Sequence, residues 1–305
     1  MGAAPGPEAN LNRRAPAQLG ARGIAPGPGS VGLVLALGGG FSRGFAHLGV
    51  LEVLEQERIP VAAIVGTSIG ALLGAAYADG IPVRELCDLG RRVRVRDFLR
   101  FKAPGSDGQR RDCIGQFIQD WFRAKAVEEL PLPTSIVTTD LDTGAPYVFA
   151  TGPLETALRA SCAFPGLVKP VPHEGRLLAD GCIVAPVPTA IAARLNSGCV
   201  FGVSVGSNST SSFGSENVVK VFDPVFGTTQ RSELEPSWSR HADILLEPRV
   251  HHIDWNDFSR VDEAFAAGPE AARLALPALR DLLGRRARLA PPPGMSSSSG
   301  RGLAQ

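Results

Sequence analysis

The five residues Gly66-Thr67-Ser68-Ile69-Gly70 have the form G-x-S-x-G, which is typical of a nucleophilic serine on a tight turn. An apolar run, Val61–Val65, precedes them, and a stretch of small residues with helical character, Ile69–Ala78, follows. A serine between a strand and a helix exposes its Oγ, and small neighbours suit a sharp, strained turn. The N-terminus of the helix favours negative charge at the same point. The pattern indicates nucleophilic attack by Ser68, although short Gly/Ser patterns also occur in ordinary turns.

A second glycine-rich segment, Gly38-Gly39-Gly40, follows the apolar run Val31–Leu37. Loops at the C-terminal ends of parallel strands meet at one edge of a sheet, so this segment is expected beside Ser68. Its backbone N–H groups could stabilise an oxyanion, each donor contributing about 3 kcal/mol. Phosphate binding is the alternative. However, the chain has no G-x-x-x-x-G-K-[ST] motif, and a dinucleotide fingerprint would need glycine in place of Arg43 and an acidic residue near Val61.

A nucleophilic serine needs a base that accepts its proton. The chain has five histidines, and none stands in a motif: His47, His173, His241, His251 and His252. A packing role is the more common one for His47 on the first predicted helix, whereas His251 and His252 could complete a Ser–Asp–His order. Asp180 ends the apolar run Leu177–Ala179. Partial desolvation there would raise the pKa of Asp180 and make it a better base, although Asp-Gly pairs also form structural turns.

The elements that would position these residues alternate between strands and helices. Val31–Leu37 and Val61–Val65 are continuous apolar runs, typical of strands buried on both faces, and each precedes a helical segment. Two such units predict an α/β domain with a mainly parallel sheet. The later elements expected are a hairpin of Ser135–Asp140 and Tyr147–Phe149, helices over about Pro153–Cys162, Thr189–Leu195 and Phe258–Leu283, and strands at Val200–Val205 and Ala242–Leu246.

The folded body is expected to be one domain over residues 31–288, since it contains no internal repeat and no clean linker. Residues 1–30 are rich in Ala, Pro and Gly without periodicity, which predicts a disordered N-terminal extension. Residues 289–305 contain three consecutive prolines and a run of serines, which predict a disordered C-terminal tail.

The composition excludes several classes of protein. Hydrophobic residues make up 44% of the chain and charged residues 20%, which is sufficient for a sizeable core. The net charge of +1 gives no reason to expect nucleic acid as a partner. The five cysteines lack metal-ligand spacing and predict reduced thiols, with no metal site. Reduced thiols indicate a cytoplasmic location. We also find no apolar run of about 18 residues and no secretory signal.

The segment Arg84–Lys102 departs from the α/β rhythm because it mixes seven basic residues with seven apolar ones. One interpretation is a solvated helix face with structural salt bridges. The other is a basic amphipathic cap that makes peripheral contact with anionic lipid head groups.

Several motifs, in chain order, resemble those of the patatin-like phospholipases, and of bacterial members in particular. The motifs are Gly38–Gly44, Leu48–Leu51, Gly66–Gly70, Thr139–Gly144, Arg159–Gly166, Asp180-Gly181, Pro186–Pro188 and Asp243–Phe258. Together they span about Val31–Ala272, which is nearly the whole body. The resemblance implies a three-layer α/β/α sandwich with a mainly parallel central sheet.

The resemblance also implies an activity, that of a serine hydrolase of lipid acyl esters that uses a Ser–Asp dyad without histidine, metal or cofactor. Ser68 would be the nucleophile and Asp180 the base. The N–H groups of Gly39, Gly40 and Phe41 would form the oxyanion hole. The other motif residues would support this arrangement: Gly38, Arg43, Gly44, Gly66, Gly70 and Gly181.

Two residues depart from the family pattern, and two other functions stay open. Phe41 stands where members often have glycine or alanine, and a bulky residue could tilt one oxyanion donor. Cys182 stands where glycine or alanine usually follows Asp-Gly, and it could alter the surroundings of the dyad.

The alternative functions are an acyltransferase of related fold, which would be expected to use histidine, and a non-catalytic regulator of patatin-like shape that binds lipid or protein.

Overall fold

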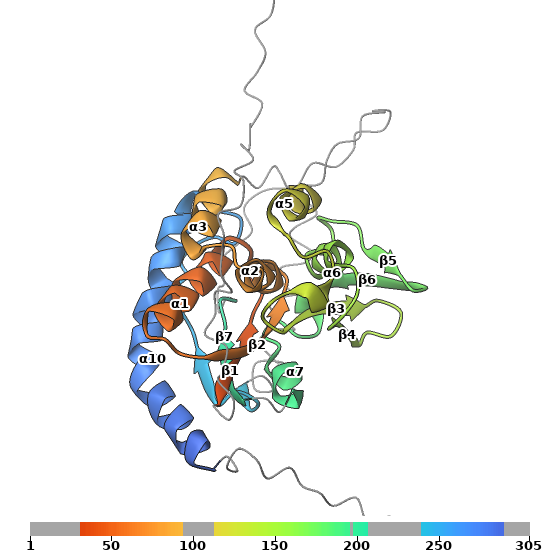
Figure 1. The fold of residues 1–305 in the computed structure, drawn as a ribbon. Helices are drawn as coiled ribbons and strands as arrows, with labels where there is room; N and C mark the ends of the chain where they lie inside the picture. The colour runs from red at the N-terminus through yellow and green to blue at the C-terminus, as the bar shows by residue number, and fades with distance from the viewer. Residues whose placement is uncertain (1–30, 94–112, 196–197, 207–238, 290–305) are drawn as a thin grey trace, which may run out of the picture.

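The computed structural model describes residues 31–93, 113–195, 198–206 and 239–289 (Figure 1). The predicted N-terminal extension, residues 1–30, and all but the first residue of the predicted tail lie outside the described residues. Residues 94–102 of the basic segment lie outside them as well.

A central sheet of eight strands has the order β5-β6-β3-β2-β1-β7-β8, with β4 also paired to β3. Its parallel part consists of β3 (Thr134–Asp140), β2 (Val61–Thr67), β1 (Gly32–Leu37), β7 (Gly198–Val203) and β8 (Ile244–Leu246). Antiparallel pairing adds β4 (Pro146–Phe149) and β6 (Arg176–Asp180) to β3, and β5 (Val171–His173) to β6. The prediction of a mainly parallel sheet is confirmed.

Helices cover both faces of this sheet, which gives three layers (Figure 1). One face packs against α1 (Phe45–Gln56), α2 (Ile69–Ala78), α3 (Val83–Arg92), α5 (Cys113–Trp121), α6 (Leu154–Ser161) and α10 (Val261–Leu289). The other face packs against α7 (Thr189–Arg194). Four short 3-10 helices complete the described elements: η1 (Phe41–Gly44), η2 (Val127–Glu129), η3 (Gly181–Ile183) and η5 (Phe258–Arg260).

The two faces of the sheet are set by alternation along its strands. On β1, Leu33, Leu35 and Leu37 belong to the larger core under α1 and α2, whereas Val34 and Ala36 belong to the smaller core under α7. Side chains alternate across a strand, so a continuous apolar run can fill both cores at once. The apolar runs therefore lie at the centre of the sheet, as expected. The short strand β5 and helix α5 were not predicted.

Helices α1 and α10 cross closely because each has a glycine at the contact. A Cβ on Gly49 would lie 2.3 Å from the carbonyl oxygen of Phe265, and one on Gly268 would lie 2.2 Å from that of Ala46. Both obstacles are backbone atoms, which cannot turn away. This crossing holds α1, and with it the end of the glycine-rich segment Gly38–Gly44, against the C-terminal helix.

Gly268→Ala is expected to destabilise the protein by about 1–3 kcal/mol, because the overpacking outweighs the gain in helix propensity. Gly284→Ala in the same helix is the matched control, since the nearest atom to its Cβ would be 3.9 Å away. It is expected to be neutral or stabilising by up to about 1 kcal/mol. Urea unfolding of both variants measures the difference, and equal midpoints would contradict the close crossing.

Candidate active site

Ser68 lies on a strained turn between β2 and α2. Its backbone has φ 54° and ψ −124°, a conformation that residues with a side chain rarely adopt. The glycines on either side permit the turn: a Cβ on Gly66 would lie 2.4 Å from Cα of Ala71, and one on Gly70 would lie 2.3 Å from the carbonyl oxygen of Leu37. The turn predicted from G-x-S-x-G is present, and both glycines are needed for close packing.

The turn is held in place by Ser161, the last residue of α6, whose role was not predicted. Its fully buried Oγ accepts a hydrogen bond from the N–H of Ser68 (2.8 Å) and donates one to the carbonyl of Val137 (2.7 Å). Thr67 adds a second anchor, because its Oγ1 donates to the carbonyl of Ala185 (2.8 Å). These bonds offset the cost of the strained backbone at Ser68.

Asp180 at the end of β6 is in direct contact with Ser68. The Oγ of Ser68 donates to Oδ2 of Asp180 at 2.7 Å, across 112 residues of sequence. The other carboxyl oxygen, Oδ1, accepts the N–H of Cys182 at 2.9 Å. The main chain of Asp180 is held as well, since its N–H donates to Ala163 and its carbonyl accepts from Thr139. Both carboxyl oxygens are therefore oriented, one of them toward the serine.

Burial decides the electrostatics of this pair. Asp180 is completely buried, which raises its pKa to about 6, against the opposing effect of the hydrogen bonds from Cys182 and Ser68. A carboxyl group with this pKa is ionised at neutral pH and is a stronger base than an exposed aspartate. In the described ranges, the hydrogen bonds of the Ser68 and Asp180 side chains involve no histidine. The ring of His47 contacts the carbonyl of Gly38 (2.7 Å), and His251 and His252 are exposed.

Cys182 packs against the dyad. Its thiol fills the space beside Gly39, where a Cβ would lie 2.0 Å from Sγ, and it interacts with the side chains of both Asp180 and Ser68. Burial and the neighbouring carboxylate hold the pKa of this thiol well above its usual value, so it stays protonated. Cys182, one of the two predicted departures from the family pattern, is thus a neutral neighbour of the dyad, and its thiol can donate a hydrogen bond to Asp180.

The glycine-rich loop lies directly beside this pair, but its three predicted donors are not equivalent. The N–H of Gly39 donates to the carbonyl of Pro186 (3.0 Å) and is already engaged. The predicted role of Gly39 as a third oxyanion donor is corrected accordingly. Within the described part of the chain, the N–H groups of Gly40 and Phe41 donate to no protein acceptor. They remain the two candidate donors, and Phe41 has a positive φ of 50°.

Residues from the late segment 253–255 anchor the loop. Arg43 is buried and its Nε donates to the carbonyl of Ile253 at 2.6 Å. Ser42 donates its N–H and its Oγ to the carbonyl of Trp255, at 3.1 and 2.8 Å. Arg43 therefore ties the loop to a residue that lies 210 positions further along the chain.

Three aromatic rings meet at this loop. The ring of Phe41 lies edge-on to Phe164 (5.2 Å between centroids) and to Trp255 (4.7 Å). Edge-to-face contacts at such distances are favourable. All three side chains are half-buried, so the cluster places an apolar surface next to the candidate oxyanion donors.

The other predicted motif residues belong to the same site. A Cβ on Gly44 would meet Ile69 after the serine, one on Gly181 would meet the carbonyl of Val137, and one on Gly38 would meet that of Pro186. These positions require glycine because neighbouring chain segments approach closely. In the described residues no group of three or more His, Cys, Asp or Glu side chains could hold a metal ion.

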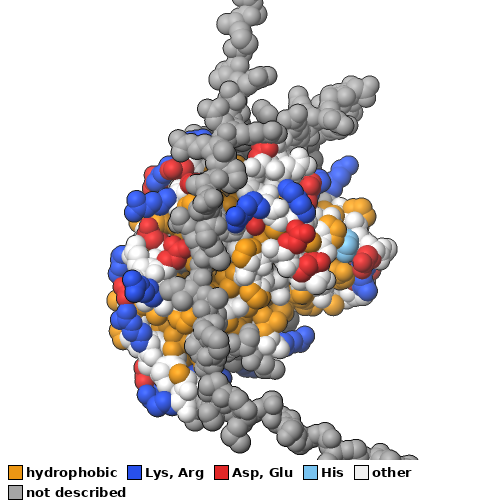
Figure 2. All heavy atoms as spheres, viewed as in Figure 1, with side chains coloured by type: hydrophobic (Ala, Val, Ile, Leu, Met, Phe, Trp, Pro, Cys, Tyr) orange, Lys and Arg blue, Asp and Glu red, His pale blue; other side chains and the backbone are white. Residues whose placement is uncertain are grey.

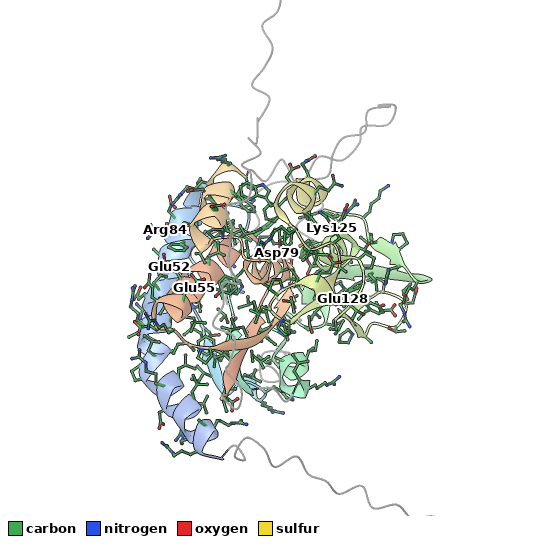
Figure 3. The ribbon with its side chains drawn as sticks, in the orientation of Figure 1. Glu52, Glu55, Asp79, Arg84, Lys125 and Glu128 are labelled. Carbon is green, nitrogen blue, oxygen red and sulfur yellow. The ribbon has the colours of Figure 1, made fainter. Side chains whose placement is uncertain are left out.

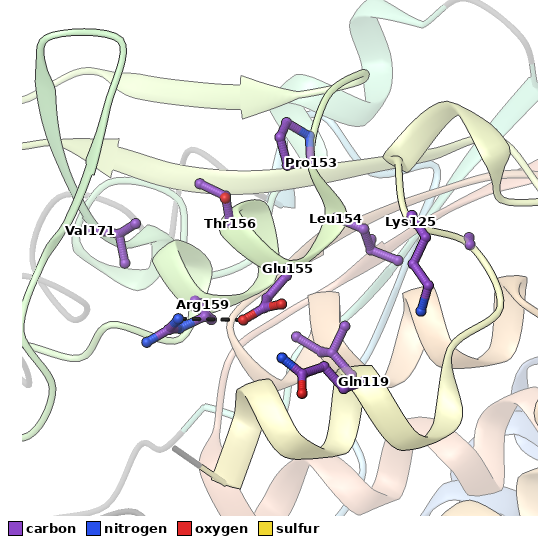
Figure 4. A pocket seen from close by; sticks show the side chains of 10 residues that line it. Gln119, Lys125, Pro153, Leu154, Glu155, Thr156, Arg159 and Val171 are labelled. Atoms are coloured by element: carbon purple, nitrogen blue, oxygen red, sulfur yellow. Dashed lines mark hydrogen bonds and ion pairs between the residues drawn. The ribbon is translucent and has the colours of Figure 1, made fainter. Parts of the chain in front are cut away.

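A cavity of about 440 Å³ lies elsewhere, between α5 and α6. Gln119, Lys125, Glu155 and Arg159 line it, and Glu155 pairs with Arg159 across one helical turn (Figure 4). Neither Ser68 nor Asp180 is among its lining residues. The cavity is therefore a feature separate from the dyad.

Comparison with known proteins assigns the family. A family model described as Patatin-like phospholipase matches residues 35–193, which include the glycine-rich loop, the serine turn and Asp180. This match covers more than half of the chain. The chain therefore belongs to the patatin-like phospholipase family, and the resemblance seen in its motifs is confirmed.

Relatives occur in bacteria and animals. An uncharacterised NTE family protein of Mycobacterium tuberculosis is 36% identical over 197 residues, which cover 64% of this chain and 53% of the relative. Patatin-like phospholipase domain-containing protein 6 of Mus musculus is 33% identical over 186 residues, covering 57% of this chain and 14% of the mouse protein. The crystal structure of VipD from Legionella pneumophila matches with a TM-score of 0.49 at 13% identity, over 83% of this chain and 68% of that one. The chain spans about half the length of the mycobacterial relatives.

The raised pKa of Asp180 predicts how stability changes with pH. The unfolded state keeps a pKa near 3.8, so the folded state loses stability as pH rises from about 4 to about 6. Asp180→Asn removes this loss and is expected to stabilise the protein by at most about 3 kcal/mol at pH 8, and by little at pH 4. Thermal unfolding of both forms at the two pH values measures the difference. An equal gain at pH 4 and pH 8 would show that burial of charge is not its cause.

Proposed function

We propose that the chain is a serine acyl hydrolase that acts on lipid esters, with Ser68 as nucleophile and Asp180 as base. The observation that carries the proposal is the 2.7 Å hydrogen bond from the Ser68 hydroxyl to the buried Asp180 carboxylate, at a strained turn. A hydroxyl whose proton is already hydrogen-bonded to an oriented base is arranged for nucleophilic attack. The family supports a lipid ester as substrate.

The first half of the reaction forms an acyl-enzyme. Oγ of Ser68 attacks the ester carbonyl while its proton moves to Oδ2 of Asp180. The negative charge that develops on the carbonyl oxygen is stabilised by the N–H groups of Gly40 and Phe41 and by the N-terminal end of α2. When the tetrahedral intermediate collapses, the bond to the leaving alcohol breaks and Asp180 returns its proton to that alcohol.

The second half releases the acyl group. Asp180, ionised again, accepts a proton from water while the water oxygen attacks the ester of Ser68. Collapse of this intermediate breaks the bond to Oγ, which takes the proton back from Asp180. One carboxyl group therefore acts as base and acid in turn, and a pKa of about 6 suits both steps near neutral pH. In this mechanism the aromatic rings of Phe41, Phe164 and Trp255 offer the apolar surface for the acyl chain.

Catalysis predicts covalent labelling by a fluorophosphonate probe, which reacts with an activated serine. Wild type should be labelled, Ser68→Ala should not, and Asp180→Asn should react at least about 100-fold more slowly because its base is lost. Gel fluorescence after a time course measures the rates, with Ser259→Ala as a control at an exposed serine outside the dyad and the glycine-rich loop. Absence of labelling with and without lipid vesicles would favour the non-catalytic regulator.

The activity should also depend on pH through Asp180. Protonation removes the base, so kcat/KM on a p-nitrophenyl ester should fall about tenfold per pH unit below about 6 and level off above it. A pH–rate profile from 4.5 to 8 measures this. Fall-off centred near pH 4 would instead indicate an exposed carboxylate, and dependence on a group near pH 7 would point to a histidine.

We further propose peripheral contact of Arg84–Lys102 with anionic membranes at a cytoplasmic location. On α3, the side chain of Arg84 is 88% exposed and makes only a long ion pair of 3.9 Å with Glu52 (Figure 3). Arg91 on the same helix is paired with Asp88 and Asp262. On the face shown in Figure 2, Lys and Arg are interspersed with Asp and Glu, which offers little to nucleic acid. Within the described ranges, no helix has both the length and the apolar character needed to cross a bilayer.

Contact of this kind predicts a strong dependence on salt. Binding to vesicles rich in phosphatidylserine should fall sharply between about 50 and 500 mM NaCl, because surface charges are screened over shorter distances. Vesicle co-sedimentation measures it, with neutral phosphatidylcholine vesicles as the control. Binding that is indifferent to salt would leave α3 as an ordinary solvated helix.

A further inference from the structure

His47 on α1 is a completely buried polar side chain that the mechanism above does not use. Its Nε2 lies 2.7 Å from the carbonyl oxygen of Gly38, the first glycine of the loop. A carbonyl oxygen only accepts, so Nε2 carries the proton and donates it. The other ring nitrogen, Nδ1, is therefore unprotonated in the neutral ring, and among the residues that the structure describes it has no hydrogen-bond partner.

The bond from His47 acts on a peptide group that is held at its other end as well. The carbonyl of Gly38 and the N–H of Gly39 belong to the same planar peptide unit. The carbonyl accepts from His47, and the N–H donates to the carbonyl of Pro186 at 3.0 Å. The carbonyl oxygen also lies against α2, since a Cβ on Gly70 would be 2.6 Å from it. A rotation of this peptide unit would break both hydrogen bonds.

This fixed peptide unit precedes the two candidate oxyanion donors. Each residue has only two free backbone angles. Fixing the plane of the Gly38–Gly39 peptide unit therefore restricts the directions that the chain can take at Gly40 and Phe41. We propose that His47 is a positioning residue, which clamps the Gly38–Gly39 peptide unit and so presents the N–H groups of Gly40 and Phe41 to the oxyanion. The inference deepens the proposed function and rests on it for its effect on rate, but the clamp itself is a property of the folded chain.

The unpartnered Nδ1 distinguishes this role from simple packing. An apolar side chain would fill the same buried space without leaving a polar atom unsatisfied, which destabilises a protein. The histidine is therefore explained by the one bond that it does make. Burial lowers the pKa of His47 to about 4, so the ring stays neutral at physiological pH and a second N–H is not introduced without an acceptor.

Two substitutions of equal length separate the donor from the volume that it fills. In His47→Gln the amide nitrogen reaches the place of Nε2 and can donate to Gly38, whereas His47→Met fills the space without a donor. On a soluble p-nitrophenyl ester, His47→Met is expected to lower kcat roughly 10- to 100-fold with KM nearly unchanged, less than the loss of an oxyanion donor itself. His47→Gln should recover most of kcat. Equal kcat for Met and wild type, or equal losses for Met and Gln, would overturn the proposal.

A second readout does not depend on catalysis. Amide hydrogen exchange of the segment 38–44, followed by mass spectrometry, should be faster in His47→Met than in wild type and slow again in His47→Gln, while β3 keeps its protection in all three. Unchanged exchange of the loop in His47→Met would refute the clamp even in an active enzyme. If wild type hydrolyses no ester while loop exchange responds as expected, the clamp stands and the proposed function fails.

Discussion

The candidate site depends on the register of β3, which lies between the strands that carry Ser68 and Asp180. Thr67 pairs with Val137 across the parallel ladder, and Asp180 pairs with Thr138 across the antiparallel one. Two adjacent residues of one strand thus set the separation between nucleophile and base. A slip of one residue on either side would turn the side chains to the opposite face and abolish the 2.7 Å contact. Ser161 joins the same point, because its hydroxyl donates to the carbonyl of Val137.

The site combines features that each oppose folding when considered alone. Ser68 and Phe41 have positive φ angles, and Asp180 is a carboxyl group without contact with water. Such features persist only where surrounding bonds determine them. The N–H of Ser68 is held by Ser161, the carboxylate accepts from Cys182 and Ser68, and the loop is tied to segment 253–255. Packing of the larger core, including the α1–α10 crossing, stabilises the fold and offsets the cost of these strained and buried groups.

The central strands and the serine turn could be predicted from the sequence, because they depend on short stretches of neighbouring residues. Apolar runs followed by Gly-rich turns specify β1, β2 and the serine turn, and the motif order indicates the family. Residue types do not determine how a peptide unit is oriented. The hydrogen bond from the N–H of Gly39 to the carbonyl of Pro186 could therefore not be predicted. The partners of Ser161 and Arg43 are also set by tertiary contacts, although Ser161 stands in a motif that was recognised. A histidine in a helix gave no signal of its bond to Gly38.

Phe41 shows how a departure from the family pattern can be compensated. A bulky residue at φ 50° is unfavourable compared with glycine, yet its ring lies between Phe164 and Trp255. Those contacts stabilise Phe41 in this conformation, and the carbonyl of Trp255 also accepts hydrogen bonds from Ser42. The loop is thus supported on one side by α1 through Gly38 and on the other by the late segment through Phe41. Two candidate donors held from both ends need little reorganisation as charge develops, which is what stabilisation of an oxyanion requires.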